Sequence, residues 1–352
     1  MATTSYGVND ALAVKLWSKK LFQDALKKTF FNKFLGKGSD SLIQIKDETA
    51  KGPGDKITVG LRMQLSGAGI QGDGTLEGNE EALTTYSDAV MIEQLRHAVR
   101  SAGKMSEQRV PFSVRSEAKA GLEDWWAERL DTWFFNVLGG YTAQTDARYT
   151  GLQSATAPTT NRKLFVTGSA DESQGSTNIF DIKMIDKFVE RAETVSPTIR
   201  PIMIGGEKKY VGFLHPYQVY DLRTSTSTGQ WLDIQKAAAA GREDSKNPIY
   251  TKALGEYHGV ILHEAPRVPQ GVNSSTAAAV TTVRRALFCG AQAAMMGYGQ
   301  KDQDGEMTWV EELFDYGNSL GVSAGMIAGM KKTVFNSEDF GVFTVSSYAA
   351  AH

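Results

Sequence analysis

The alternation of apolar and polar residues between positions 47 and 100 predicts a long β-hairpin. In the first leg apolar side chains occupy every second position, at Ile57, Val59, Leu61, Met63 and Leu65. A period of two is typical of a half-buried strand. A glycine-rich stretch over 66–79 follows, and apolar residues return between Thr84 and Arg100. We therefore expect two extended legs joined by a tip with few large side chains.

The predicted hairpin needs support from other parts of a structure. A leg of about 15 residues spans roughly 50 Å at ~3.3 Å per residue. A two-stranded ribbon is at best marginally stable by itself in water. The hairpin must therefore either fold back onto its own domain or be supported by a neighbouring copy of the chain.

A helical period follows the hairpin. Large apolar residues recur at Leu122, Trp125, Trp126, Leu130, Trp133, Phe134, Val137 and Leu138. With a start at Phe112-Ser113 and a stop at Gly139-Gly140, this spacing predicts a helix over residues 111–138. Its length would be roughly 39 Å at ~1.5 Å per residue. Tryptophans on one stripe are more typical of a core than of a binding site, so we interpret this helix as a spine against which sheets pack.

The rest of the chain mixes both kinds of element. Residues 141–180 form a polar connection rich in Thr, Ser and Gly. The pattern then predicts helices over 182–192, 216–222 and 231–240, and short strands over 210–214, 259–263 and 286–289. From Met307 to Phe343 it returns to strands. The expected fold class is mixed α+β.

A lysine-rich segment precedes the hairpin. Residues 11–28 have helical periodicity, and residues 1–38 carry seven lysines against two aspartates, a charge of +5. The segment can be a solvated amphipathic helix, a helix on a membrane surface, or an arm that docks on an acidic neighbour. Lys20 and Lys28 interrupt the apolar stripe, which argues against the membrane alternative.

The tip and return leg of the hairpin have the opposite charge. Residues 71–95 contain six acidic side chains and neither lysine nor arginine: Asp73, Glu77, Glu80, Glu81, Asp88 and Glu93. A basic segment and an acidic loop on one chain are the arrangement expected for complementary contacts between copies.

Composition further narrows the classes of function that the chain can have. The net charge of −2 gives no overall attraction to nucleic acid or membrane. The single cysteine, Cys289, lies in an apolar stretch and is expected to be buried and inert. The first residues lack the apolar run of a signal peptide, and no stretch of about 18 apolar residues occurs. We expect a soluble protein made inside a cell.

Motifs for chemistry are weak. Gly67-Ala68-Gly69-Ile70-Gln71-Gly72 matches a dinucleotide-binding string, but the acidic sequence after it does not predict the required helix. The string Asp302–Glu306 resembles the start of a calcium loop whose later ligands are out of register. The five histidines have no zinc-site spacing. We predict no catalytic residue, no cofactor and no metal; missing motifs do not exclude an enzyme, but no group of residues here favours one, and we expect that the protein is not an enzyme.

Several longer strings, spread in order over most of the chain, resemble the major capsid proteins of tailed bacteriophages with the Hong Kong 97-like fold, and specifically their N-four-type branch. They are Gly67-Ala68-Gly69 with Leu76–Glu81, Gln94–Arg100, Asp124–Arg129, His215–Leu222 and Glu311–Asn318. The resemblance implies a shell-forming protein that assembles in the host bacterial cytoplasm and becomes part of the virion.

The resemblance also implies a division of the chain. It gives an N-terminal arm (1–46), a β-hairpin E-loop (47–86), a P-domain with the spine helix (87–180), an α/β A-domain (181–300) and C-terminal strands that return to the P-domain (301–352). In that family arms and E-loops reach over adjacent subunits, and copies form hexamers and pentamers. Scaffold, portal and cement or decoration proteins are expected partners. Non-specific contact with packaged double-stranded DNA is also expected, and no membrane contact.

Two departures from the family matter. Some relatives crosslink a loop lysine to a neighbouring asparagine, but residues 57–103 contain no lysine. The chain also begins at the arm, so we hypothesise a separately encoded scaffold.

We expect the basic arm and the acidic loop to meet between subunits. The hypothetical contact residues are Lys15, Lys19, Lys20, Lys27, Lys28, Arg62, Glu77, Glu80, Glu81, Arg96 and Arg100. An encapsulin-like compartment is the alternative function, and a nucleotide-dependent enzyme a distant one.

Overall fold

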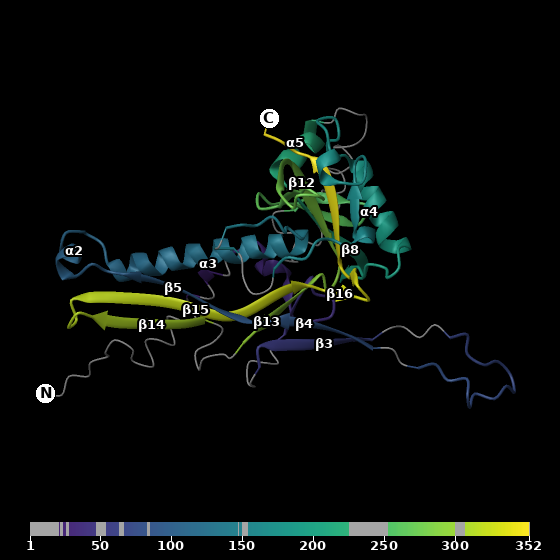
Figure 1. The fold of residues 1–352 in the computed structure, drawn as a ribbon, viewed down its shortest axis with the longest axis horizontal. Helices are drawn as coiled ribbons and strands as arrows, with labels where there is room; N and C mark the ends of the chain where they lie inside the picture. Colours follow the sequence, from purple (N-terminus) through teal and green to yellow (C-terminus); the bar gives the residue numbers. More distant parts are fainter. Residues whose placement is uncertain are drawn as a thin grey trace.

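The computed structural model describes residues 21, 24–25, 28–46, 54–62, 67–82, 85–146, 148–149, 154–224, 253–299 and 307–351, with the backbone alone at 61, 62 and 85. A long helix and two sheets make up the body, and one hairpin extends away from it (Figure 1). This mixed α+β architecture confirms the predicted fold class. No helix among the described residues is long and apolar enough to cross a membrane.

The spine helix is α3, Val114–Gly139. The helix ends where predicted, because Gly140 adopts the left-handed conformation at φ 57°. Tyr141 N–H then donates to the Asn136 carbonyl at 2.9 Å, as in a Schellman motif. Trp126 is fully buried, whereas Trp125 and Trp133 are partly buried against the same core. The prediction of a core stripe is confirmed.

A six-stranded sheet lies along α3 (Figure 1). Its strands are β1 (Leu35–Gly36), β2 (Ile43–Lys46), β13 (Ala294–Tyr298), β15 (Ser319–Lys332), β14 (Met307–Phe314) and β5 (Glu93–Arg100). The first part of β15 pairs antiparallel with both β14 and β5, and its last part pairs with β13. Strand β2 joins β13 in parallel. The short helix α2, Lys104–Gln108, connects β5 to the spine.

An eight-stranded sheet forms the second body. Its strands are β6 (Lys163–Phe165), β18 (Val342–Tyr348), β12 (Ala279–Cys289), β8 (Glu207–Leu214), β10 (Val260–Glu264), β9 (Ala253–Tyr257), β11 (Gln270–Val272) and β7 (Ile202–Ile204). Helices α4 (Ile182–Thr194) and α5 (Pro216–Thr224) accompany it. On α4, Phe188 stacks on Phe288 of β12 with ring centroids 4.6 Å apart. Asp181 caps this helix by accepting from Ile182 N–H at 2.7 Å.

Two short connections join the sheets and touch each other. Residues 290–293 lead from β12 into β13, and residues 333–341 lead from β15 to β18. Gly290 N–H donates to the Gly341 carbonyl at 2.8 Å. The second connection also contains the small pair β16 (Val334–Phe335) and β17 (Glu338–Asp339).

Sheet membership differs from the predicted boundaries in four places. Strands β1 and β2, from the predicted arm, and β13, from the predicted A-domain segment, belong to the six-stranded sheet. Strand β6 lies in the segment predicted as a connection, and β18 joins the eight-stranded sheet rather than returning to the spine-helix side. These pairings link residues far apart in sequence, which local periodicity does not reveal. The helices predicted near 182 and 216 and the strands near 210 and 260 are confirmed. The predicted helix 231–240 and the calcium-like string lie outside the described residues.

Candidate assembly surfaces

The predicted hairpin exists, and its tip projects from the body. Strand β3 (Lys56–Arg62) pairs antiparallel with β4 (Thr85–Met91), from Lys56 opposite Met91 to Arg62 opposite Thr85. Beyond them, residues 67–82 run out past the end of the sheet (Figure 1). We call residues 67–82 the projecting loop. Its side chains are exposed, except for a half-buried Ile70. Met63 and Leu65 of the predicted first leg lie outside the described residues, and the projecting loop is not folded back onto its own body.

Hydrogen bonds within the projecting loop give it a defined shape. Glu81 accepts from Gly67 N–H at 2.7 Å, and Glu80 accepts from Gly78 N–H at 2.8 Å. Asn79 N–H donates to the Leu76 carbonyl at 3.0 Å, and this turn leaves the Leu76 side chain 62% exposed. No helix follows Gly72 in this described segment, so the structure excludes the dinucleotide-binding interpretation.

The base of the hairpin is fixed to the body. Asp88 of β4 is 7% exposed; it accepts from Val334 N–H at 3.0 Å and is paired with Lys331 of β15. Strand β4 also passes very close to β15, since a Cβ added to Gly329 would lie 1.9 Å from the Met91 carbonyl oxygen. The body therefore sets the direction in which the loop projects.

The N-terminal segment is docked on the spine helix of its own chain. Both carboxylate oxygens of Asp131 accept from Phe30 N–H, at 2.9 and 3.0 Å. Burial raises the pKa of Asp131 to about 6, against the opposing effect of the backbone donors and of Arg267. Phe31 stacks on Phe134 with ring centroids 5.1 Å apart.

Of the candidate arm lysines, Lys28 alone lies among the described residues. Lys28 forms ion pairs with Asp124 at 2.8 Å and Glu123 at 3.3 Å on α3 of the same chain, which the sequence did not lead us to expect. This pairing limits what Lys28 can offer to another subunit. The other candidates, Lys15, Lys19, Lys20 and Lys27, lie outside the described residues.

The remaining candidates are distributed over the loop and β5. Glu77 is exposed on the projecting loop, and the side chain of Arg62 is outside the description. Arg96 and Arg100 are exposed on β5. Arg100 Nε donates to Ser319 Oγ at 3.0 Å, and its guanidinium lies 4.3 Å from the Phe314 ring centroid. The structure places the acidic loop and the two arginines far apart within one chain (Figure 1).

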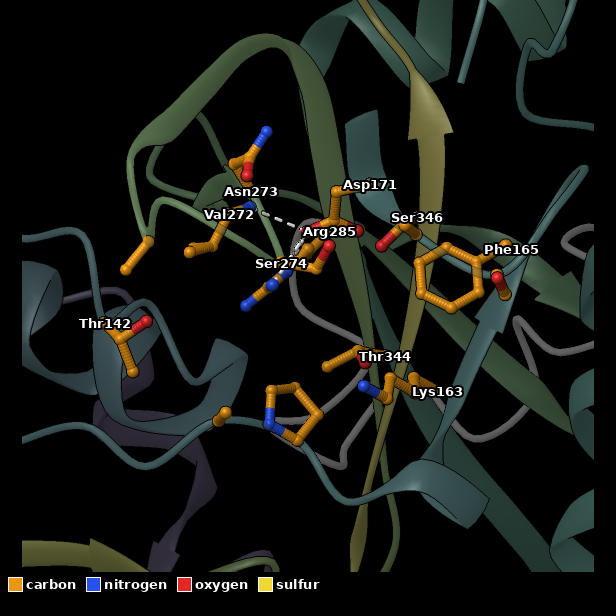
Figure 2. A pocket seen from close by; sticks show the side chains of 15 residues that line it. Thr142, Lys163, Phe165, Asp171, Val272, Asn273, Ser274, Arg285, Thr344 and Ser346 are labelled. Carbon is orange, nitrogen blue, oxygen red and sulfur yellow. Dashed lines mark hydrogen bonds and ion pairs between the residues drawn. The ribbon is translucent and has the colours of Figure 1, made fainter. Parts of the chain in front are cut away.

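A buried ion pair joins the eight-stranded sheet to the end of the spine helix. Arg285 of β12 pairs with Asp171 at 2.7 Å and donates to the Gly139 and Gly140 carbonyls at 3.1 and 2.9 Å. The same Asp171 oxygen accepts from Val272 N–H at 2.7 Å. Figure 2 shows this pair beside a pocket of about 280 Å³ that Lys163 and Thr344 also line. Sequence analysis missed the pair, because its members are 114 positions apart.

Groups suited to chemistry are buried or scattered. Cys289 is a fully buried free thiol whose pKa burial raises, which confirms the expectation of an inert cysteine. Among the described residues, no cluster of three His, Cys, Asp or Glu side chains could hold a metal ion.

Known proteins similar to this chain are viral shell proteins. A family model described as phage capsid protein matches residues 5–351. The major capsid protein of Pseudomonas phage KPP25 is 29% identical over 372 residues, covering 96% of this chain and 94% of the relative. The solved capsid of Ralstonia phage GP4 superposes with a TM-score of 0.82 at 34% identity over 99% of both chains. The cyanophage Pam1 capsid shares the fold, with a TM-score of 0.72 at 21% identity over 93% of this chain and 94% of that one.

Proposed function

The chain belongs to the phage capsid protein family and is a major capsid protein that forms the virion shell, and we propose that its copies hold one another through the projecting loop. We also propose how the copies are arranged in the shell. Hexamers and pentamers close into the icosahedral head of a tailed phage around double-stranded DNA. Scaffold, portal and cement or decoration proteins are the proposed partners, and the host bacterial cytoplasm is the proposed place of assembly.

The observation that carries the proposal is the isolation of a shaped, charged loop. Asp73, Glu77, Glu80 and Glu81 give residues 67–82 four negative charges and no positive one. The loop has internal hydrogen bonds but nearly all of its side chains are exposed, so it contributes little burial to its own monomer. A neighbouring copy can supply both the missing burial and the opposite charge.

Contacts of this kind are expected to be non-covalent. The segment from 57 to 103 contains no lysine, so the loop side chains cannot supply a lysine amine for an isopeptide bond. Exposed ion pairs contribute only ~0–1 kcal/mol each. Apolar burial must therefore supply most of the stability, and charge should set the register between copies.

Charge reversal tests the proposal. Replacing Glu77, Glu80 and Glu81 together with lysine should abolish particles while leaving the protein soluble, as measured by sedimentation and negative-stain electron microscopy. Reversal of two exposed glutamates on α4, Glu190→Lys with Glu193→Lys, is the control and should leave assembly unaffected. Normal particles from the triple variant would refute the role of the loop. Particles that retain an enzyme and no genome would instead favour an encapsulin-like compartment.

A further inference from the structure

The pocket beside the Asp171–Arg285 pair joins segments that are far apart in the sequence (Figure 2). Its lining comes from the connection after the spine helix, from β6 and β18, and from the turn between β11 and β12. The volume of about 280 Å³ lies near the lower end of the range of small-molecule sites, which is roughly 300–1,000 Å³. A molecule bound there would contact several separate elements at once.

Strands β6 and β18 supply one wall of the pocket. They pair in parallel, with Lys163 opposite Thr344 and Phe165 opposite Ser346. Side chains two residues apart on a strand lie on the same side of the sheet. All four residues line the pocket, so an amine, an aromatic ring and two hydroxyl groups share this wall.

Three charged side chains line the pocket, and two of them neutralise each other. Arg285 pairs with Asp171 Oδ2 at 2.7 Å, and the other oxygen of this carboxylate, Oδ1, is buried. Glu172, the next acidic residue along the chain, accepts from Ser274 N–H at 3.2 Å and from the Ser274 hydroxyl. The third charge is Lys163, which has no carboxylate partner among the described residues.

A further cation lies near Lys163. Lys332 is 1% exposed and pairs with Asp339 at 2.9 Å. Burial lowers the pKa of Lys332, and the charges of Arg285 and Lys163 lower it further, against the opposing effect of Asp339. Three cations therefore lie close enough to act on one another, while two carboxylates balance them. The excess positive charge is at Lys163, in the wall of the pocket.

The neutral part of the lining suits an organic molecule with an anionic group. The hydroxyl groups of Thr142 and Ser346 can donate hydrogen bonds to an oxyanion, and Ser346 is only 2% exposed. Phe165, Pro158 and Val272 supply apolar surface. Apolar walls with a few polar groups that fix the orientation of a ligand are typical of small-molecule sites.

We propose that this pocket binds a small organic oxyanion, with its carboxylate or phosphate group at Lys163 and its apolar part against Phe165. The bound molecule joins β6 and β18 to the segment that follows the spine helix and to the turn between β11 and β12. It thereby stabilises the junction of the spine helix with the eight-stranded sheet. The inference concerns the single chain and goes beyond the proposed assembly.

Calorimetric titration of the full, unassembled chain tests the proposal. The probes are benzoate for a carboxylate and inorganic phosphate for a phosphoryl group, at constant ionic strength with chloride as the balancing anion. We expect saturable binding of at least one probe, together with a rise in Tm, because a ligand that binds only the folded state stabilises it. Benzamide, which has the ring of benzoate without its charge, should not bind.

Substitution of Lys163 locates the site. Lys163→Met should weaken binding about 10- to 100-fold, because it removes a charge-assisted hydrogen bond, whereas Lys163→Arg should retain binding. Lys183→Met, at an exposed position of α4, is the matched control and should bind like the unmodified protein. Circular dichroism checks that each variant is folded.

Two results would overturn the proposal. One is the absence of saturable binding for both probes, which would mean that the pocket holds water alone. The other is equal affinity in the unmodified protein and in Lys163→Met. If Lys163→Met does not fold, the comparison of benzoate with benzamide decides in its place, and equal binding of the two would contradict an anion site. None of these results bears on shell assembly, which particle formation tests separately.

Discussion

Asp131, in the C-terminal half of the spine helix, accepts from Phe30 N–H through both carboxylate oxygens, at 2.9 and 3.0 Å, and is itself only 6% exposed. This bond fixes the point at which the N-terminal segment meets the body. Around it lie Arg267, which donates to the Glu128 carbonyl and Thr132 Oγ, and Lys28 with its two acidic partners on α3. An ionisable group thus stands at the centre of the attachment.

The Asp131 site predicts a pH dependence of stability. Its pKa is about 6 in the folded chain against 3.8 in the unfolded one, so the folded state binds the proton more tightly. Protonation of Asp131 therefore contributes roughly 2–3 kcal/mol to the free energy of unfolding. This contribution is fully present below pH ~4 and is lost as the pH rises through 6. Denaturant unfolding of unassembled protein between pH 4 and 7 should show this decline, and Asp131→Asn should remove it. Glu117→Gln, at an exposed position of the same helix, is the control; equal slopes for all three proteins would contradict the assignment.

The crossing of β4 over β15 predicts that Gly329 tolerates no side chain. A Cβ there would lie 1.9 Å from backbone at Met91, so Gly329→Ala must move the base of the hairpin. We expect a loss of about 2–3 kcal/mol in unfolding free energy, as for other overpacked sites. Gly121→Ala is the control, because the added methyl meets nothing within 4 Å and improves helix propensity by up to ~1 kcal/mol. Equal denaturation midpoints for the two variants would refute the argument.

Because Asp88 fixes the base of the hairpin to the body, we expect its substitution to weaken the attachment of the hairpin without changing the residues of the projecting loop. Asp88→Ala leaves Lys331 unpaired and Val334 N–H without its acceptor, at a cost of about 3 kcal/mol. Limited proteolysis should then cleave near the ends of β3 and β4 sooner than in the unmodified protein. Asp88→Asn retains an oxygen for Val334 and should be intermediate. Identical cleavage rates in the three proteins would show that the hairpin base is held by other contacts.

The buried pair of Asp171 and Arg285 predicts strong coupling between the spine helix and the eight-stranded sheet. Arg285→Met should cost roughly 3–5 kcal/mol, because it leaves Asp171 buried and uncompensated and removes the donor to the Gly139 and Gly140 carbonyls. Adding Asp171→Leu should recover part of this loss. The checking measurement is a double-mutant cycle by denaturant unfolding. Additive effects of the two substitutions would mean that the pair does not act as a unit.

Much of the fold could be predicted because its signals are local. The tryptophan stripe of α3, the period of two in β3 and the glycine stop at Gly140 are each encoded within a few residues. The pairing of β2 with β13 and of β18 with β12 depends instead on residues that meet only after folding. For that reason the predicted boundaries follow the order of the chain, whereas the sheets do not.

The candidate surfaces, like the fold, could be predicted only where their signals are local in the sequence. The acidity of the projecting loop and its few large side chains could be foreseen from the sequence, whereas its exposure could not, because a hairpin folded back onto its own domain was an open alternative. The place of Arg96 and Arg100 on one face of the six-stranded sheet could not be foreseen, because it requires the register of β5 against β15. The intrachain pairing of Lys28 was missed because its acidic partners are 95 and 96 positions away.

The two connections between the sheets bear on how this subunit can change shape. Residues 290–293 and 333–341 cross at one point, through the Gly290–Gly341 hydrogen bond, and form a narrow link between the sheets. An added Cβ at Gly290 would lie 2.3 Å from the Arg200 carbonyl oxygen, and one at Gly341 would lie 2.8 Å from the Ala291 carbonyl oxygen, so the crossing is tightly packed. The end of the spine helix also links the two sheets, since Arg285 of β12 donates to the Gly139 and Gly140 carbonyls, so a tilt between the sheets would change both sets of contacts. We therefore expect copies that differ in curvature within a shell to differ at this crossing and at the Arg285 contacts, while the strand pairing inside each sheet stays the same.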